Sequence, residues 1–395
     1  MTDVAASRLA SSLDRLGTES AFSVLARAKE LEREGRDVIH LEIGEPDFDT
    51  PAHVCEAAIE AMRAGHTHYC PSAGMPELRD AAAEYLSNSR GVDVDSGRVL
   101  IATGAKPFLF FTILAVCDPG DEVIYPDPGF PIYESAISWA GAEPVALPLH
   151  EDKDFVFDVG ELGARLSPRT KLVILNSPQN PTGGLIDAST LDDTAALLQE
   201  SNAWVLSDEV YWRLVYEGEF TSIASRPGML DRTILLDGLS KAYAMTGWRC
   251  GFAAVPQSLI DPLVRFFVNS TSCVPPFVQL AGVAALTGPQ TPVEEMLEEF
   301  RSRRQLVIDR LNDIPGVNCR HPAGAFYAFP NVGSLTVNAD ELATKLLEEA
   351  GIALLPGSAF GQMGRDNLRI SYANSQSNLD RALDRITSLV DNLAQ

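Results

Sequence analysis

A lysine follows an apolar run of the sequence, which is an unusual place for a charge. Residues 233–237 read TILLD, Ser240 and Lys241 come three and four residues after this run, and Arg249 lies eight residues beyond Lys241. Burial and a neighbouring positive charge both disfavour the ammonium form, so both lower the pKa of an amine. A neutral amine can attack a carbonyl group. We therefore expect Lys241 to act chemically in a largely dry site.

A carboxylate ends another apolar run. AWVLS at 203–207 is followed by Asp208, and a buried carboxylate is costly unless it is paired. Capping of a following helix would be a purely structural explanation for Asp208. The alternative is that Asp208 faces a positively charged partner in a site.

The two runs belong to a series of short segments rich in Val, Ile and Leu. The series comprises RVLIA (98–102), DEVIY (121–125), PVALP (144–148), KLVILN (171–176), AWVLS (203–207), TILLD (233–237) and GFAAV (251–255). Continuous apolar runs are typical of strands covered on both faces. With amphipathic segments such as 77–88 and 189–200 between them, they predict an α/β fold with a mostly parallel sheet flanked by helices.

Polar or Gly/Pro-rich loops follow most of these predicted strands. The loops are TGAK, DPGFPIY, NSPQNPTGG, DEVY and GLSK. Ligands of open α/β sheets bind outside the carboxyl ends of the strands. The five loops therefore predict one binding site at one edge of the sheet.

The chain divides into parts of different pattern. After position 285 come charged helical stretches at 292–312, 339–350 and 377–394, with short apolar runs between them, which is an α+β pattern. Residues 19–34 predict a helix. We expect a large domain at 45–285 and a smaller one at 286–395, which the segment 1–44 joins.

Composition excludes several classes of protein. The formal net charge of −23 repels phosphate backbones, so we expect no nucleic-acid partner. Apolar runs are too short for a membrane span, and polar residues interrupt the start too often for a signal peptide, so we expect a cytoplasmic protein that does not bind membranes. The six cysteines form no CxxC pair and the six histidines no HExxH motif, which leaves no case for a metal site.

The motifs together resemble a class I aminotransferase of the pyridoxal-phosphate fold-type I family, similar to the aspartate aminotransferases of bacteria and archaea. They are LEIGEPDFDTP (41–51), THYCPSAGMPELR (67–79), TGAK, NSPQNPTG, SDEVY, SKAYAMTGWRCGF and NLRISYA (367–373). Their joint order and spacing cover nearly the whole chain. The resemblance implies a large cofactor-binding domain, a smaller α+β domain and the cofactor pyridoxal 5′-phosphate.

The resemblance also assigns the catalytic roles. Lys241 would hold the cofactor's aldehyde carbon and then move a proton between the substrate Cα and the cofactor. Asp208 would pair with the protonated pyridine nitrogen, which lets the ring accept electrons. Tyr211 and Asn180 would contact the phenolic oxygen. Asn180 alone could also be an ordinary turn residue before Pro181.

Further cofactor contacts are implied at the phosphate and the ring. Gly104, Ala105 and Lys106 lie where a helix begins, and a helix N-terminus offers free N–H groups to an anion. Ser240 and Arg249 would add donors to the phosphate, while Phe130 would stack on the ring and Tyr69 would reach the phosphate of a neighbouring subunit. The family's serine three residues before the lysine is Gly238 here, which puts one phosphate hydrogen bond in doubt.

Substrate recognition is divided between two ends of the amino acid. The resemblance places Arg369 and Asn180 on the α-carboxylate, with the backbone of Gly44 close to it. Lys106 opposes the dipole of its own helix, and in relatives of this pattern a lysine here contacts the distal carboxylate of acidic substrates. Thr18 could close over the same pocket.

The alternative for this pocket is one that takes larger side chains. The aromatic residues that could line it are Phe108, Phe110, Phe111, Phe326 and Phe360, although most of them are expected in the core.

We therefore expect a homodimeric aminotransferase with shared active sites. It would move an amino group from an L-amino acid, glutamate or aspartate, to a 2-oxo acid by a ping-pong mechanism. An aminotransferase for neutral or aromatic amino acids and a β-elimination lyase on the same scaffold remain open. A cofactor-sensing regulator would need a DNA-binding module, for which we expect no room ahead of the GEPDF motif.

Overall fold

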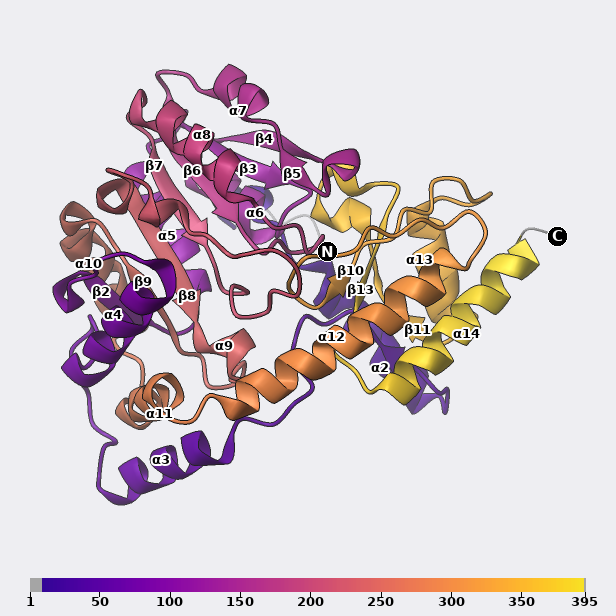
Figure 1. Ribbon diagram of the computed structural model, residues 1–395, viewed down its shortest axis with the longest axis horizontal. Helices are drawn as coiled ribbons and strands as arrows, with labels where there is room; N and C mark the ends of the chain where they lie inside the picture. The colour runs from indigo at the N-terminus through magenta and orange to yellow at the C-terminus, as the bar shows by residue number, and fades with distance from the viewer. Residues whose placement is uncertain (1–8, 394–395) are drawn as a thin grey trace.

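The computed structural model describes residues 9–393, and a sheet of eight strands forms its larger part (Figure 1). The strand order is β2-β9-β8-β7-β6-β3-β4-β5. The strands are β2 (Val99–Ala102), β3 (Glu122–Asp127), β4 (Glu143–His150), β5 (Val156–Phe157), β6 (Thr170–Asn176), β7 (Trp204–Asp208), β8 (Thr233–Gly238) and β9 (Gly251–Ala254).

The prediction of an α/β fold with a mostly parallel sheet is confirmed. Strands β4, β3, β6, β7 and β8 run parallel, whereas β9 is antiparallel to both β2 and β8, and β5 is antiparallel to β4. The connection from β8 to β9 holds only the four-residue helix α9 (Leu239–Ala242) and a turn. A parallel neighbour needs a crossover, usually a helix that packs across the sheet, and the four-residue α9 is too short for that, so the pair is antiparallel.

Each face of the sheet packs against its own helices, because alternate residues of a strand point to opposite faces. In β8, Ile234 and Leu236 pack with helix residues Phe108 and Tyr133, whereas Leu235 packs on the other side in a cluster with Leu78. All of these side chains are buried. The expectation of strands covered on both faces is thus confirmed.

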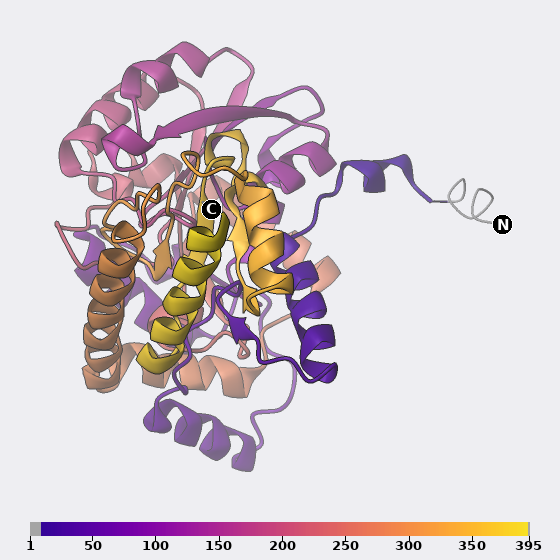
Figure 2. The same ribbon diagram turned by 90° about the vertical axis from the view of Figure 1, so that its right-hand side faces the viewer.

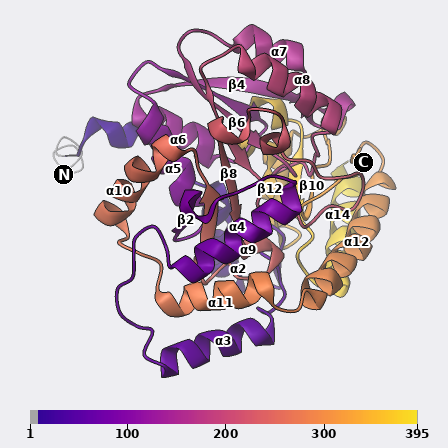
Figure 3. The ribbon, with the colours of Figure 1, turned by 60° about the vertical axis from the view of Figure 1, so that its left-hand side comes forward.

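Thirteen α-helices occur in the described range, and α3 and α11 lie side by side below the sheet in Figure 3. The helices besides α9 are α2 (Ser20–Arg33), α3 (Ala52–Arg63), α4 (Pro76–Arg90), α5 (Lys106–Val116), α6 (Ile132–Ala140), α7 (Val159–Arg165), α8 (Ala188–Gln199), α10 (Ile260–Ser270), α11 (Pro276–Thr287), α12 (Thr291–Asn312), α13 (Ala339–Glu348) and α14 (Gln376–Leu393). None of the helices within 9–393 is long and apolar enough to span a bilayer.

A smaller part combines both ends of the chain. Strand β1 (Ile39–His40) pairs in parallel with β11 (Ile352–Ala353), and β13 (Leu368–Ser371) pairs with β10 (Tyr327–Ala328) and β12 (Leu355–Pro356). Helices α2, α12, α13 and α14 cover these strands in Figure 2. The pairing agrees with the expected joining role of segment 1–44, of which residues 1–8 lie outside the described range; the domain boundaries stay a prediction.

Candidate active site

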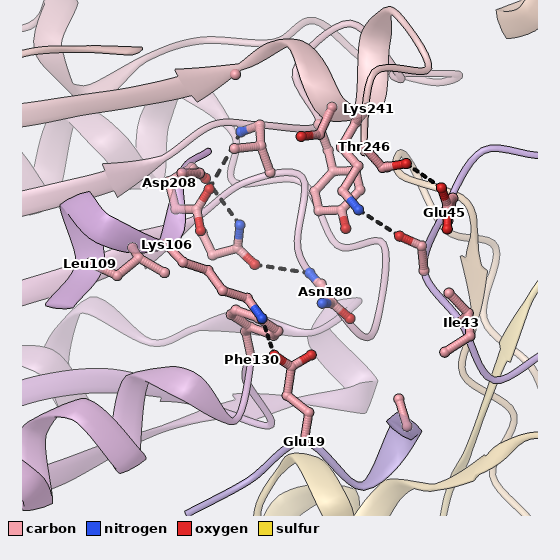
Figure 4. Close-up of a pocket in the computed structure, with 18 of the residues that line it drawn as sticks. Glu19, Ile43, Glu45, Lys106, Leu109, Phe130, Asn180, Asp208, Lys241 and Thr246 are labelled. Atoms are coloured by element: carbon pink, nitrogen blue, oxygen red, sulfur yellow. Dashed lines mark hydrogen bonds and ion pairs between the residues drawn. The ribbon is translucent and has the colours of Figure 1, made fainter. Parts of the chain in front are cut away.

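One cavity of about 470 Å³ opens where the carboxyl ends of the large sheet meet the smaller part. Most of the residues predicted from the sequence line it: Gly44, Ala105, Lys106, Phe130, Asn180, Asp208, Tyr211, Ser240, Lys241, Arg249 and Arg369. Figure 4 shows several of them pointing into a shared space. The expectation that separate loops converge on one edge therefore describes the observed arrangement.

Lys241 lies on α9, one turn beyond the end of β8, and its side chain enters the cavity. Its Nζ donates a hydrogen bond to the carbonyl oxygen of Gly44 at 2.5 Å. Burial, followed by the charge of Arg369, lowers the pKa of Lys241 to about 8, and the carboxylate of Glu45 opposes this shift. Arg249, the neighbour considered from the sequence, makes a smaller contribution. The amine is thus partly neutral near physiological pH.

Asp208 is the last residue of β7, and its side chain is buried at 5% exposure. Its Oδ2 accepts a hydrogen bond from the hydroxyl of Tyr133 at 2.7 Å. Burial raises the pKa of Asp208 to about 6, while the hydrogen bond from Tyr133 opposes the rise. No helix begins directly after Asp208, since the next helical element starts at Ile223, so the capping explanation is wrong.

Asn176 ends the neighbouring strand β6 and is paired in register with Asp208. Its Nδ2 donates to the carbonyl oxygen of Asp208 at 3.0 Å, and its Oδ1 accepts from the backbone N–H of Asn180 at 2.9 Å. These contacts fix the loop that carries Asn180 against the end of β7. Sequence reasoning did not single out Asn176, although its place at a strand end could have identified it.

Arg369 on β13 forms the wall opposite the sheet. Its Nη1 donates to Oδ1 of Asn180 at 3.2 Å and its Nη2 to the carbonyl oxygen of Glu42, while its guanidinium lies 4.7 Å from the ring centre of Tyr327. Its Nε is buried without a hydrogen-bond partner among the described residues. An orphaned buried donor in a cavity indicates that Arg369 is arranged for a ligand.

Tyr327 of β10 links the cavity walls. Its hydroxyl lies 2.7 Å from the hydroxyl of Tyr211. A Cβ on Gly44 would collide with the same hydroxyl, so only glycine fits there. Tyr327 belongs to the GAFYAFP run, where its aromatic neighbours gave no signal that it would face the site.

Gly104, Ala105 and Arg249 form a cradle beside the start of α5. The φ angle of Gly104 is +90°, and a Cβ there would collide with Nη2 of Arg249. Ala105 precedes Lys106, the first residue of α5, so backbone N–H groups point out of this helix end. Gly104 does not itself line the cavity among the described residues, but its missing side chain leaves room for the arginine. The cradle suits an anion.

Lys106 forms an ion pair with the carboxylate of Glu19, and its Nζ lies 5.4 Å from the ring centre of Phe130. Glu19 immediately precedes α2 and lines the cavity. The neighbouring Thr18 is exposed and does not line it, so the expectation for Thr18 is wrong. Of the five phenylalanines considered for this pocket, none lines the cavity in the described structure.

Tyr69 lies outside the cavity of its own chain. Its side chain is 90% exposed. The predicted role of Tyr69 at a phosphate therefore depends on a second copy of the chain and stays a prediction.

No group of three or more His, Cys, Asp or Glu residues within 9–393 could hold a metal ion.

Comparison with known proteins gives one consistent result. The model of the family "Aminotransferase class I and II" matches residues 36–386. The chain is 40% identical to an aspartate aminotransferase of Pyrococcus horikoshii over 359 residues, which are 90% of this chain and 91% of that protein. It is also 40% identical over 357 residues to aromatic-amino-acid aminotransferase 2 of Thermococcus litoralis, with 89% and 92% of the two chains covered.

A solved structure resembles the whole fold. The crystal structure of the aspartate aminotransferase from Rhizobium meliloti superimposes with a TM-score of 0.93 at 38% identity, covering 97% of this chain and 99% of the other.

Proposed function

Because this chain belongs to the class I and II aminotransferases, we propose that it binds pyridoxal 5′-phosphate in this cavity and moves an amino group from an L-amino acid to a 2-oxo acid. One observation carries the proposal. A cavity at the sheet edge holds both an amine with a pKa of about 8, Lys241, and a buried carboxylate, Asp208.

The residues present fit the cofactor at both of its polar ends. The cradle of Gly104, Ala105 and Arg249 offers N–H groups and a guanidinium to a phosphate. At the other end, Asp208 is held by Tyr133 and Asn176, and its carboxylate is available for a ring nitrogen. Gly238 faces the cavity where the family has serine, and Ser240 is the nearby hydroxyl that would serve the phosphate instead.

When bound, the cofactor supplies an aldehyde for the amino group and a ring that accepts electrons. The protein's residues then have separate tasks. Lys241 would hold the cofactor at its aldehyde carbon, and its Nζ would move the proton at the substrate Cα. Asp208 would hold the proton on the ring nitrogen. Tyr211 and Asn180 would donate to the ring oxygen, and Phe130 would pack on the ring face.

We place the α-carboxylate of the substrate on Arg369. Its unsatisfied Nε supports this assignment, because a guanidinium binds a carboxylate best through two parallel N–H groups. Asn180 contacts both Arg369 and the loop beside Asp208, so it lies between the substrate and the cofactor. The carbonyl of Gly44 already accepts from Lys241 and keeps the amine close to this end.

We propose glutamate or aspartate as the amino donor, with the distal carboxylate on Lys106. The relatives named aspartate aminotransferase support acidic donors. The relative named for aromatic amino acids and the apolar lining by Leu109, Phe130 and Phe22 keep uncharged side chains as a second class. The relatives give no support to a β-elimination lyase.

We further propose that the enzyme is a homodimer with shared active sites. Tyr69 is 90% exposed, and the large apolar residues Leu13, Leu16 and Val268 are exposed as well. Leu13 lies in the short 3₁₀ helix Ser11–Arg15 and Leu16 follows it. The N-terminal segment ahead of α2 projects from the body in Figure 2. A second copy would cover these apolar side chains. Sedimentation at twice the chain mass would agree with this proposal, and a stable monomer with full activity would contradict it.

A panel of amino donors tests the function. The protein loaded with pyridoxal 5′-phosphate is mixed with single amino acids, and the absorbance of the cofactor is followed before 2-oxoglutarate or pyruvate is added. We expect glutamate and aspartate to convert the cofactor fully, and a 2-oxo acid to restore it. Steady release of pyruvate and ammonia without an acceptor would indicate a lyase and overturn the proposal.

A further inference from the structure

Glu19 places a carboxylate inside the substrate cavity, on the lysine proposed for substrate recognition. Its Oε1 is paired with Nζ of Lys106, as Figure 4 shows. The side chain of Glu19 is 17% exposed, whereas that of Lys106 is 43% exposed. The carboxylate of Glu19 therefore already pairs with the ammonium group of Lys106, to which an acidic substrate would bind.

Side-chain capping of α2 does not explain this carboxylate. Glu19 stands at the N-cap of α2, where Ser, Thr, Asp or Asn would accept a hydrogen bond from the first turn. The side chain of Glu19 makes no such bond in the described chain, and its carboxylate meets the Nζ of Lys106 instead, as Figure 4 shows. We therefore look for its role in the cavity.

The cavity has two cations that a dicarboxylate could bridge. Burial lowers the pKa of Arg369, and Glu19 is among the anions close enough to oppose that shift. Arg369 keeps a free Nε, whereas Lys106 is already paired. Glu19 thus supplies one of the two carboxylates that a bound dicarboxylic acid would bring.

The arm before Glu19 is anchored separately from its side chain. The backbone N–H of Gly17 donates to Oγ of Ser135 at 2.9 Å, and Nε of Arg15 donates to the carbonyl oxygen of Ser138 at 2.9 Å, both on α6. Rotation of the Glu19 side chain alone can therefore release Lys106, without displacement of the arm. Since the carboxylate is partly exposed, water can solvate it once it is released.

We propose that Glu19 takes the place of the substrate's distal carboxylate on Lys106 when no acidic substrate is bound. We propose that it thereby sets the preference of this enzyme between acidic and uncharged side chains. An acidic substrate displaces Glu19 from Lys106. An uncharged side chain leaves the ion pair intact and lies against Phe130 and Leu109. This inference rests on the proposed function, because it takes the cavity to be the site for amino acids.

Such an exchange serves a ping-pong enzyme. Donor and acceptor occupy the same pocket in turn, and the two can differ in the charge of their side chains. With Glu19 present, Lys106 has a carboxylate partner in both cases: Glu19 when the side chain is uncharged, and the substrate when it is acidic. Acidic substrates bind less tightly as a result, because part of their binding free energy is used to displace Glu19 from Lys106.

The test measures binding without turnover. Calorimetry on the protein loaded with pyridoxal 5′-phosphate gives the affinities for glutarate, a dicarboxylate, and butanoate, a monocarboxylate. In E19Q and E19A we expect glutarate to bind about 3- to 10-fold more tightly, as for loss of a partly exposed competing ion pair, with butanoate changed less than about 2-fold. E30Q, which removes an exposed carboxylate of α2 that pairs with Arg27, should change neither affinity.

Unchanged or weaker glutarate binding in both Glu19 variants would overturn the proposal. An equal gain for butanoate would also overturn it, because Glu19 would then act on the α-carboxylate end. On a K106Q background, the Glu19 substitution should add no gain for glutarate, and a gain that persisted there would contradict the pairing. If the wild-type protein reacted with no amino acid, the proposed function would be wrong. The affinities for glutarate and butanoate would still test the pairing of Glu19 with Lys106, because they are measured without turnover.

Discussion

The two walls of the cavity are built in different ways. One wall, here called the sheet wall, consists of Asn176, Asp208 and Lys241 at or just beyond the ends of adjacent parallel strands. The opposite wall, the outer wall, consists of Glu19, Gly44, Tyr327 and Arg369, which come from both ends of the chain. Backbone ladders hold the first wall, whereas side-chain contacts such as Tyr211–Tyr327 and Arg369–Asn180 join the second to it.

The two walls therefore suit different tasks: the sheet wall suits catalysis, and the outer wall suits the selection of substrates. The sheet wall carries Lys241 and Asp208, whose pKa values burial shifts to about 8 and about 6, which suits proton transfer and charge stabilisation. The outer wall carries groups that face the substrate's carboxylates and one ion pair that can exchange. Substitutions in the sheet wall should therefore reduce all reactions alike, and those at the outer wall should change the ranking of substrates.

Lys241→Ala should have the largest effect. It removes the only amine that reaches the proposed aldehyde position from α9, so we expect activity to fall by about 10⁴-fold or more for every substrate. The characteristic absorbance of lysine-bound cofactor should also be lost, as a spectrum would show. Retained absorbance with unchanged activity would end the assignment of Lys241.

Asp208→Asn should reduce all half-reactions to the same degree. Loss of one preorganised electrostatic partner raises the barrier by roughly 2–4 kcal/mol, while cofactor binding should persist because Tyr133 and Asn176 still hold the side chain and backbone. Single-turnover rates with glutamate and with an uncharged donor measure this. Wild-type rates in this variant would contradict the proposed role of Asp208. A lower rate for only one class of donor would contradict the expectation that substitutions in the sheet wall slow all reactions alike.

Lys106→Ala should distinguish between substrates, since Lys106 lies where the two walls meet. We expect affinity for glutamate and aspartate to fall about 5- to 20-fold, as for loss of one charged hydrogen bond, with little change for neutral donors. Competition kinetics between the two classes provide the measurement. An equal loss for both classes would point to a role of Lys106 at the phosphate instead.

Gly238→Ser should have the smallest effect, and it should strengthen binding of the cofactor, whereas the other substitutions weaken function. A Cβ at Gly238 would lie 3.5 Å from Cα of Gly251 and 3.6 Å from the carbonyl oxygen of Cys250, which are ordinary contacts, and its φ of −173° suits any residue. The added hydroxyl should tighten cofactor binding about 2- to 5-fold, measured by titration of the cofactor-free protein. Weaker binding would show that the phosphate does not lie beside Gly238.

Much of the sheet wall could be predicted because its signals are local. Lys241, Asp208 and the loops after the strands are each encoded within a few residues, and the seven predicted runs all became strands of the large sheet. The family resemblance drawn from those motifs is confirmed by the family match over residues 36–386. Asn176 followed the same rule and was overlooked only because it precedes the more conspicuous NPTG motif.

The outer wall could not be predicted to the same extent. Glu19 meets Lys106 across 87 positions, and Arg369 meets Asn180 across 189. Nothing in the residues around Glu19 distinguishes it from Thr18, which was the residue expected in the pocket. Which of two neighbouring side chains enters a cavity depends on where the arm is anchored, here by Gly17 on Ser135.

The sequence by itself determined the order of elements, the strand-end chemistry of Lys241 and Asp208 and the family, because apolar periodicity and short motifs depend on nearest neighbours in the chain. Only the tertiary structure decided that Arg369 keeps a free Nε and that Glu19 occupies Lys106. Burial and charge pairing depend on distances in space, and those distances exist only after both ends of the chain have packed against the sheet.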